Sequence, residues 1–463
     1  MNPLAVAPTA PGRGLAAPTG AGADPLPAWD GFKYGLLGLP LAFVALPLYV
    51  LLPNHYAREF GVPLATLGAL LVGVRLLDAA TDPLLGRWSD RLFARSPQTV
   101  VRVGGLAALV LLAGFALLFF PPARSGNALL AWAAALLTLT YLAFSLLSIA
   151  HQSWGAMLGG GEARRSRVVA WREGLGLVGV VLASVTPVAL GLPATVVLLA
   201  LALAAGWLAW GRALVPSPAA AAGHGDGAGP GGAPLAARPA GRLGLPWQNA
   251  AFRRLLAVFM LNGIASAVPA TLVLFFVQDR LQAPRSLEPV FLGTYFVCAA
   301  LSIPLWLKVV ARLGLARTWG VGMALAIAVF GWAALLGPGD GAAFVAVCAL
   351  SGVALGTDLA LPGALLAGVI ADAGQRGRAE GAYFGWWNFA TKLNLALAAG
   401  LALPLLGLFG YTPGTRDPAA LQALTVAYCL LPCALKLLAA AALYGWILRP
   451  TPAPLAASSR DLP

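Results

Sequence analysis

The sequence has little charge. Only 10% of its 463 residues are Asp, Glu, Lys or Arg, whereas 59% are hydrophobic, and the mean hydropathy is +0.81. A soluble protein of this length needs a far more charged surface to stay in solution. Because long apolar runs also recur along the whole chain, the composition excludes an ordinary soluble domain and indicates an integral membrane protein.

Cysteine and histidine are scarce as well. The four cysteines lie in apolar segments without a Cys-x-x-Cys pair, and the three histidines are far apart in the chain. This pattern excludes a disulfide framework and indicates no metal centre. The chain also lacks a Gly-x-Ser-x-Gly elbow and a His-Glu-x-x-His motif. We therefore expect no enzyme and no cofactor, and an intramembrane enzyme is the weakest alternative.

The apolar runs are long enough to predict twelve membrane-spanning helices, since a spanning helix needs about 20 apolar residues. The predicted spans are 32–53, 64–86, 99–120, 128–157, 168–190, 193–213, 252–276, 288–311, 316–337, 342–371, 379–408 and 420–448. The fold class expected is therefore an all-α membrane protein.

One long connection divides these spans into six plus six. Residues 214–250 are rich in Gly, Ala and Pro and predict a cytoplasmic linker between two six-helix bundles, at 29–213 and 251–449. The ends, 1–28 and 450–463, read as a disordered N-terminal tail without a signal peptide and as a C-terminal tail. Two bundles joined by a long loop are typical of secondary transporters, which bind substrate and ion between the halves.

The basic residues predict the orientation in the membrane. The net charge is +13, and 22 of the 30 Lys and Arg fall in segments on the side of the N-terminus, whereas 5 fall on the opposite side. This asymmetry places both termini in the cytoplasm. The excess of Lys and Arg then reports topology and contact with lipid headgroups rather than nucleic acid. We expect a monomer in a bacterial inner membrane.

The second span carries three charges. In "LLVGVRLLDAATDPLLGRWSDR", Arg75, Asp78 and Asp82 are three and four residues apart, so they share one helix face. Each such charge costs roughly 2.5–3.5 kcal/mol in the bilayer centre, so the face must turn toward protein or water. Two carboxylates one turn apart suit Na⁺ or a proton. The alternative is a structural Arg75–Asp78 ion pair.

The stretch "RLLDAATDPLLGRWSDR" resembles the second helix of the glycoside–pentoside–hexuronide:cation symporters, the melibiose-permease group of the major facilitator superfamily. The resemblance implies the two-bundle fold of that superfamily and a cation site at Asp78 and Asp82. It also implies that Gly86, Asp90 and Arg91 fasten a cytoplasmic gate, for which a solvated turn is the alternative.

Two further stretches resemble the same group. "ARRSRVVAWREGLGLVG" implies that Arg172 faces the substrate, and "GAYFGWWNFATKLNLALAAG" implies that Lys392 faces the cation site, with Asp78 and Asp82 as its counter-ions. Snorkelling of Lys392 toward an edge is the alternative. The other candidates for substrate contact, each with packing as its alternative, are Tyr34, His151, Gln152, Trp387 and Asn388.

The sequence departs from the group where sugars are held. The sugar carriers have an aspartate in span one and another in span four, and these positions align with Ala42 and Ser148. We therefore expect a substrate other than a melibiose-like sugar. A lysolipid or another amphipathic metabolite is an alternative. The resemblance also leaves Asp358 and Lys436 unexplained, and a pair between spans ten and twelve would satisfy both.

These features together predict a secondary active transporter that couples Na⁺ or H⁺ to symport of a small organic solute by alternating access. A uniporter or exporter, in which the charges serve only the gate, is the first alternative. A transport-dead membrane sensor on the same fold is the second.

Overall fold

The computed structural model describes residues 26–122, 125–216 and 243–449. Almost all of these residues are helical, and no strand occurs within the described ranges. The predicted tails and linker lie largely outside them, except for the ends of 214–250. There, a short helix, α9 (Leu245–Gln248), stands directly before the C-terminal half. Its Trp247 packs edge-on against Trp386.

The N-terminal half contains six long helical segments. The first is interrupted, because Pro40, Pro47 and Pro53 each remove a backbone N–H from the helix ladder. Its pieces run from residue 28 to residue 59, further than the predicted 32–53. The helices of this half are α1 (Ala28–Gly35), α2 (Gly38–Leu46), η1 (Pro47–Leu51), α3 (Leu52–Glu59), α4 (Leu64–Arg95), α5 (Pro97–Phe119), α6 (Gly126–Met157), α7 (Glu162–Ala189) and α8 (Gly191–Gly211).

The C-terminal half contains six more. Its last segment is again composite, with two π-helical stretches between 418 and 448. The helices are α10 (Ala250–Phe275), η3 (Phe276–Arg280), η4 (Arg285–Leu287), α11 (Glu288–Leu313), α12 (Leu315–Ala333), α13 (Gly341–Asp372), α14 (Glu380–Leu408), α15 (Pro418–Thr425), η5 (Val426–Leu430), α16 (Leu431–Leu443) and η6 (Tyr444–Leu448). The two halves thus form the predicted pair of six-helix bundles.

Length and composition allow ten of these segments to cross a membrane, within the residues that the structure describes. The helices α4 and α14, of 32 and 29 residues, complete the twelve. Each half has its own apolar core. The core of the first centres on residues such as Leu111, Phe115 and Trp210. That of the second includes Phe276 and Phe344.

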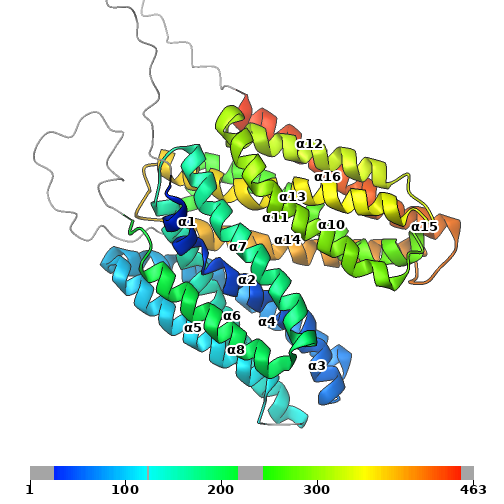
Figure 1. Cartoon of the computed structure of the whole chain (residues 1–463), viewed down its shortest axis with the longest axis horizontal. Helices are drawn as coiled ribbons and strands as arrows, with labels where there is room; N and C mark the ends of the chain where they lie inside the picture. The colour runs from blue at the N-terminus through cyan, green and yellow to red at the C-terminus, as the bar shows by residue number, and fades with distance from the viewer. Residues whose placement is uncertain (1–25, 123–124, 217–242, 450–463) are drawn as a thin grey trace, which may run out of the picture.

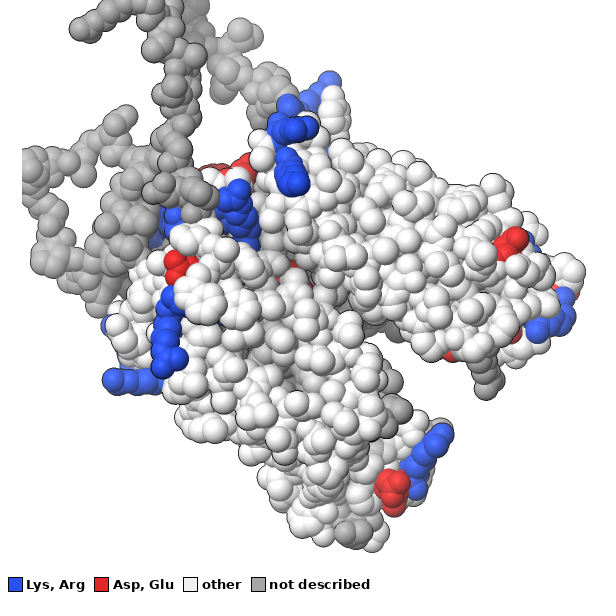
Figure 2. All heavy atoms as spheres, in the orientation of Figure 1, with Lys and Arg blue, Asp and Glu red and all other residues white. Residues whose placement is uncertain are grey.

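The two bundles meet at one end and diverge toward the other, where α3 and α15 lie apart (Figure 1). We call the first the linker end, because the chain leaves and re-enters the two halves there, at Pro216 and Leu243. We call the second the far end. The space-filling view shows the hollow that opens between the bundles toward the far end (Figure 2). The halves touch through α4 against α14 and through α7 against α11 and α13.

Candidate functional site

Three charged side chains meet at the contact between the halves. The Lys392 Nζ atom on α14 lies 2.7 Å from Asp78 Oδ2 and 2.8 Å from Asp82 Oδ2, both on α4. It also donates a hydrogen bond of 2.9 Å to Asp82 Oδ1. Asp82 is fully buried and Asp78 is 5% exposed. The structure therefore brings together the two predicted cation-binding carboxylates and their predicted counter-ion, and the lysine does not snorkel to an edge.

A fourth residue, Ser145, contacts these charged side chains, although the sequence did not predict it as a site residue. Its hydroxyl on α6 donates to Asp78 Oδ1 at 2.8 Å and accepts from Lys392 Nζ at 2.8 Å. Ser145 lies one turn before Ser148, the position that aligns with the sugar-binding aspartate of span four. A lone serine in an apolar helix gives no signal of its own, because such hydroxyls usually bond the preceding turn. We call Asp78, Asp82, Ser145 and Lys392 the inter-half cluster.

Glycines let the two helices carrying the cluster approach closely. A Cβ atom added to Gly385 of α14 would lie 2.6 Å from the carbonyl oxygen of Asp82, and one added to Gly86 would lie 2.1 Å from that of Gly381. Such contacts are shorter than real Cβ atoms make, so only glycine fits. The backbone contact holds α4 against α14 and places Lys392 within reach of both aspartates.

Arg75 lies outside the cluster. Its guanidinium carbon stands 4.4 Å from the centroid of the Tyr49 ring, in cation–π geometry. The predicted alternative of an Arg75–Asp78 ion pair is absent from the described part of the chain, where Asp78 pairs with Lys392 instead. The arginine thus turns to an aromatic ring rather than to a carboxylate.

Two of the three predicted gate residues form a contact between the halves. The Asp90 carboxylate at the end of α4 accepts hydrogen bonds from the backbone N–H groups of Gly381 (2.6 Å) and Ala382 (2.9 Å), in the first turn of α14. A carboxylate at this position also faces the positive end of the α14 dipole. With the Gly86–Gly381 contact, it closes the linker end. Arg91 is exposed.

Two predicted substrate contacts, Tyr34 and His151, bond each other within the N-terminal half. The Tyr34 hydroxyl donates to the His151 carbonyl (3.0 Å), and His151 Nε2 lies 2.8 Å from the Tyr34 carbonyl. Tyr34 is 2% exposed and His151 is fully buried, and their rings lie 4.4 Å apart. These reciprocal bonds tie α1 to α6 within one half. The burial of His151 was not visible in the sequence, because a histidine between apolar residues suits a core and a cleft equally well.

The other four predicted substrate contacts differ in their surroundings. Gln152 and Arg172 line a cavity between the halves, as Tyr34 also does. Its volume, about 10 Å³, holds at most about one water molecule. The Arg172 guanidinium forms an ion pair with Glu173. Trp387 stacks on Phe259 and is 6% exposed, within an apolar cluster that also contains Ile149 of the N-terminal half. Asn388 is half-buried.

A second group of charges lies within the C-terminal half. Lys436 Nζ on α16 lies 3.0 Å from Asp358 Oδ2 on α13, so the predicted pair between spans ten and twelve is present. The same carboxylate accepts from Asn262 (3.0 Å), Ser266 (3.1 Å) and Trp319 (2.9 Å). The lysine also donates to Asn262 Oδ1 at 2.7 Å. We call these five residues the C-half cluster.

Comparison with known proteins identifies the family. The family model for MFS/sugar transport proteins matches residues 31–215 and 235–447. Among curated proteins, no sequence matches this one.

Solved structures show the same fold at low identity. A bacterial homologue of the iron transporter ferroportin, in an outward-facing state, has a TM-score of 0.64 at 16% identity, over 92% of this chain and 100% of that one. The human organic anion transporter MFSD10 gives 0.57 at 18% identity, over 90% and 100%. The E. coli fucose:proton symporter FucP gives 0.58 at 13%, over 89% and 98%. The chain therefore belongs to the MFS/sugar transport protein family, and it is a membrane transporter with the major facilitator fold.

Proposed function

We propose that the protein is a symporter that couples Na⁺ or H⁺ to the movement of a small organic solute by alternating access. The observation that carries the proposal is the charge count of the inter-half cluster. Two buried carboxylates, Asp78 and Asp82, face a single ammonium, Lys392, so one negative charge is uncompensated. An uncompensated buried charge is costly, and a proton or Na⁺ neutralises it.

The position of the cluster explains how a cation would be coupled to movement. The carboxylates belong to the N-terminal half and Lys392 to the other half, so the ion pair crosses the contact that alternating access must open. A cation that binds the carboxylates weakens their hold on Lys392. A ligand shifts a conformational equilibrium by its difference in affinity for the two states, and this competition supplies such a difference.

The direction of opening follows from the basic residues. Lys and Arg gather near the linker end, although they also occur at the tips of the far end (Figure 2). By the positive-inside rule we assign the linker end and both termini to the cytoplasm of a bacterial inner membrane. The conformation, closed at the linker end, is then outward-facing. We retain the expectation of a monomer.

The substrate proposal rests on what the cleft lacks. The sugar-binding acids of the melibiose-permease group align with Ala42 and Ser148, and Ser148 accepts a hydrogen bond from Gln152. Losing a charged hydrogen bond costs roughly 1.5–3 kcal/mol, or about 10- to 150-fold in affinity. We propose a solute other than a melibiose-like sugar, taken up near Gln152, Arg172 and Asn388, with a lysolipid or other amphipathic metabolite as the alternative.

The test is transport by right-side-out vesicles with an imposed Na⁺ or H⁺ gradient, screened first for a solute that accumulates. Asp78→Asn and Asp82→Asn should then each reduce gradient-driven accumulation per folded molecule to background. Passive exchange of the solute can persist. Asp340→Asn is the matched control, because this carboxylate lies in the exposed turn before α13. It should accumulate solute at the wild-type level.

Each alternative has its own outcome. Unchanged uptake in both Asn variants would mean that α4 does not hold the cation site. Flux of every solute at a rate independent of the gradient would indicate a uniporter, and flux only outward an exporter. No flux from correctly folded protein would indicate a sensor.

A further inference from the structure

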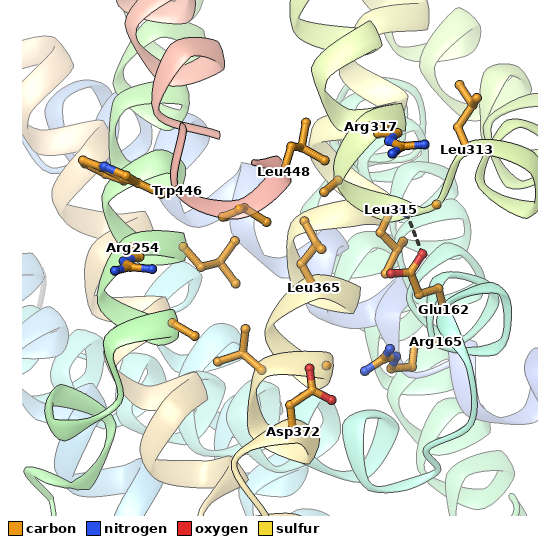
Figure 3. Close-up of a pocket in the computed structure, with 17 residues that line it drawn as sticks. Glu162, Arg165, Arg254, Leu313, Leu315, Arg317, Leu365, Asp372, Trp446 and Leu448 are labelled. Atoms are coloured by element: carbon orange, nitrogen blue, oxygen red, sulfur yellow. Dashed lines mark hydrogen bonds between the residues drawn. The ribbon is translucent and has the colours of Figure 1, made fainter. Parts of the chain in front are cut away.

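A cavity of about 440 Å³ lies at the linker end, away from the inter-half cluster. One wall comes from the first turn of α7 in the N-terminal half. The other walls come from α10, the end of α11, α12, α13 and η6 in the C-terminal half. Figure 3 shows the side chains that carry its chemistry, namely Glu162, Arg165, Arg254, Arg317, Asp372 and Trp446.

Positive charge predominates in this cavity. Arg254 lies on one side of it, and Arg165 and Arg317 lie on the other (Figure 3). Within the described part of the chain, none of these three side chains forms an ion pair or a side-chain hydrogen bond. The Arg165 Nε atom is moreover buried without a partner.

The two acids in the cavity do not balance the arginines. One oxygen of the Glu162 carboxylate is already engaged in the cavity wall, because Oε2 accepts the backbone N–H of Leu315 at 2.8 Å, at the start of α12. Asp372 is exposed at the end of α13. Three guanidinium groups against two carboxylates leave one net positive charge in the cavity, which suits an anion.

Arg165 reaches across from the N-terminal half into the C-terminal half. A Cβ atom added to Gly368 of α13 would lie 2.5 Å from an amino nitrogen of Arg165, so the guanidinium rests directly against the α13 backbone. The complete set of three arginines therefore exists only while the halves are together at the linker end.

We propose that this cavity binds the phosphate-bearing headgroup of an anionic membrane lipid and thereby favours the conformation closed at the linker end. The planar fork of arginine matches phosphate oxygens in pairs. A free phosphate has the same head chemistry, but the cavity also presents Leu255, Leu365 and Ile447. Trp446 at its edge is 48% exposed, as expected of an aromatic residue at the lipid interface.

The effect on conformation follows from the two-sided construction of the site. A headgroup held by Arg165 on one half and by Arg254 and Arg317 on the other binds the closed linker end better than the open one. The difference between its binding free energies for the two states therefore stabilises the closed state. The proposal needs neither the coupling cation nor the transported solute. Lipid binding can therefore fail while the proposed symport holds, and symport can fail while lipid binding holds.

The experiment measures lipid binding by the full-length protein. Wild-type protein is purified into phosphatidylcholine with or without phosphatidylglycerol, and the retained phosphatidylglycerol is counted by native mass spectrometry. The double variant Arg254→Gln, Arg317→Gln should lose roughly tenfold or more in affinity. The double variant Arg95→Gln, Arg312→Gln removes the same charge from exposed helix ends and should bind as wild type does.

Further measurements separate the outcomes. Phosphatidylglycerol should raise the melting temperature of wild-type protein and of the control, but not of the Arg254→Gln, Arg317→Gln variant. It should also lengthen the distance between spin labels on the ends of α3 and α15. Because Arg254 and Arg317 are exposed, the variant should elute as monodisperse protein, which confirms that it folds. Equal retention of the lipid by both double variants would overturn the proposal. Stabilisation by inorganic phosphate alone, without retention of phosphatidylglycerol, would overturn the lipid as the ligand.

Discussion

The inter-half cluster and the C-half cluster are built from the same kinds of residue but differ in two respects. In the C-half cluster one carboxylate, Asp358, faces one ammonium, Lys436, and accepts hydrogen bonds from four donors. In the inter-half cluster two carboxylates share one ammonium. The C-half cluster is also contained in one bundle, whereas the other crosses the contact between bundles. Balanced charge within one bundle suits a structural role, and unbalanced charge across the contact between bundles suits a functional one.

The largest expected effect is a difference in stability and uptake between substitutions of Lys436 and of Lys392. Lys436→Ala leaves the Asp358 carboxylate, whose side chain is only 15% exposed, without its counter-ion and should lower the free energy of unfolding by about 3–5 kcal/mol. Lys392→Ala should reduce stability less, because the two halves can separate at their contact and admit water to the aspartates. It should nevertheless abolish gradient-driven accumulation. Denaturant titration in detergent and vesicle uptake per folded molecule check the two halves of this prediction.

The control for the two lysine substitutions is to replace all the charged residues of a cluster together by apolar ones. Asp358→Leu with Lys436→Met removes both charges together and should recover most of the stability while keeping uptake, since a buried ion pair can be replaced without loss. Asp78→Leu, Asp82→Leu and Lys392→Met combined should fold but accumulate nothing. Lost uptake in the first combination, with the fold intact, would give the C-half cluster a functional role as well.

A smaller effect is expected from substitution of Gly86. This residue contacts α14, which carries Lys392, so the substitution should affect the inter-half cluster and not the C-half cluster. In Gly86→Ala the new methyl group would meet the Gly381 carbonyl, so α4 and α14 must separate and the linker end must open. Reactivity of an introduced cysteine in the cleft should rise at the linker end and fall at the far end, by about tenfold for each 1.4 kcal/mol of shift.

Gly331→Ala is the matched control, since nothing lies within 4 Å of the methyl group that it would add. It should leave cysteine reactivity unchanged at both ends. The stability of the C-half cluster should be unaffected by either glycine substitution. Identical reactivity in Gly86→Ala and wild type would show that the glycine contact does not control closure.

The smallest effect is expected from Ser145→Ala. The hydroxyl joins Asp78 to Lys392 but carries no charge, so its loss should weaken the cluster by about 0.5–1.5 kcal/mol, equivalent to roughly 2- to 12-fold in apparent cation affinity. Maximal uptake at saturating cation should persist. Ser266→Ala is the counterpart in the C-half cluster and should leave cation affinity unchanged. A complete loss of coupling in Ser145→Ala would make the serine a required ligand rather than a bridge.

Much of the fold could be predicted from the sequence. The twelve apolar runs, the long linker and the mid-span charges of Asp78, Asp82 and Lys392 are strong local signals, because the bilayer penalises any exception to apolar helices. The exact course of the first span could not be predicted. Three prolines there permit several arrangements of helix and π-turn, and packing against the other helices of the same half selects one.

The site was harder to predict than the fold, because membership of a site depends on which helix faces meet. Tyr34 and His151 had the polarity of cleft residues, yet they bond each other inside one half. Ser145 gave no signal but joins the cluster. The arginine-lined cavity combines six helical elements from both halves, and a pattern along the chain cannot reveal such a convergence.

The surplus charge of the inter-half cluster also has a consequence for membrane voltage. In the symport that we propose, the cluster of two carboxylates and one ammonium returns empty with one negative charge, whereas with a bound monovalent cation it is neutral. A potential of 100 mV acts on an elementary charge with about 2.3 kcal/mol when the charge crosses the whole membrane. In a cell with a negative interior, voltage would therefore speed the return of the empty site toward the outside and leave the loaded inward step nearly unaffected.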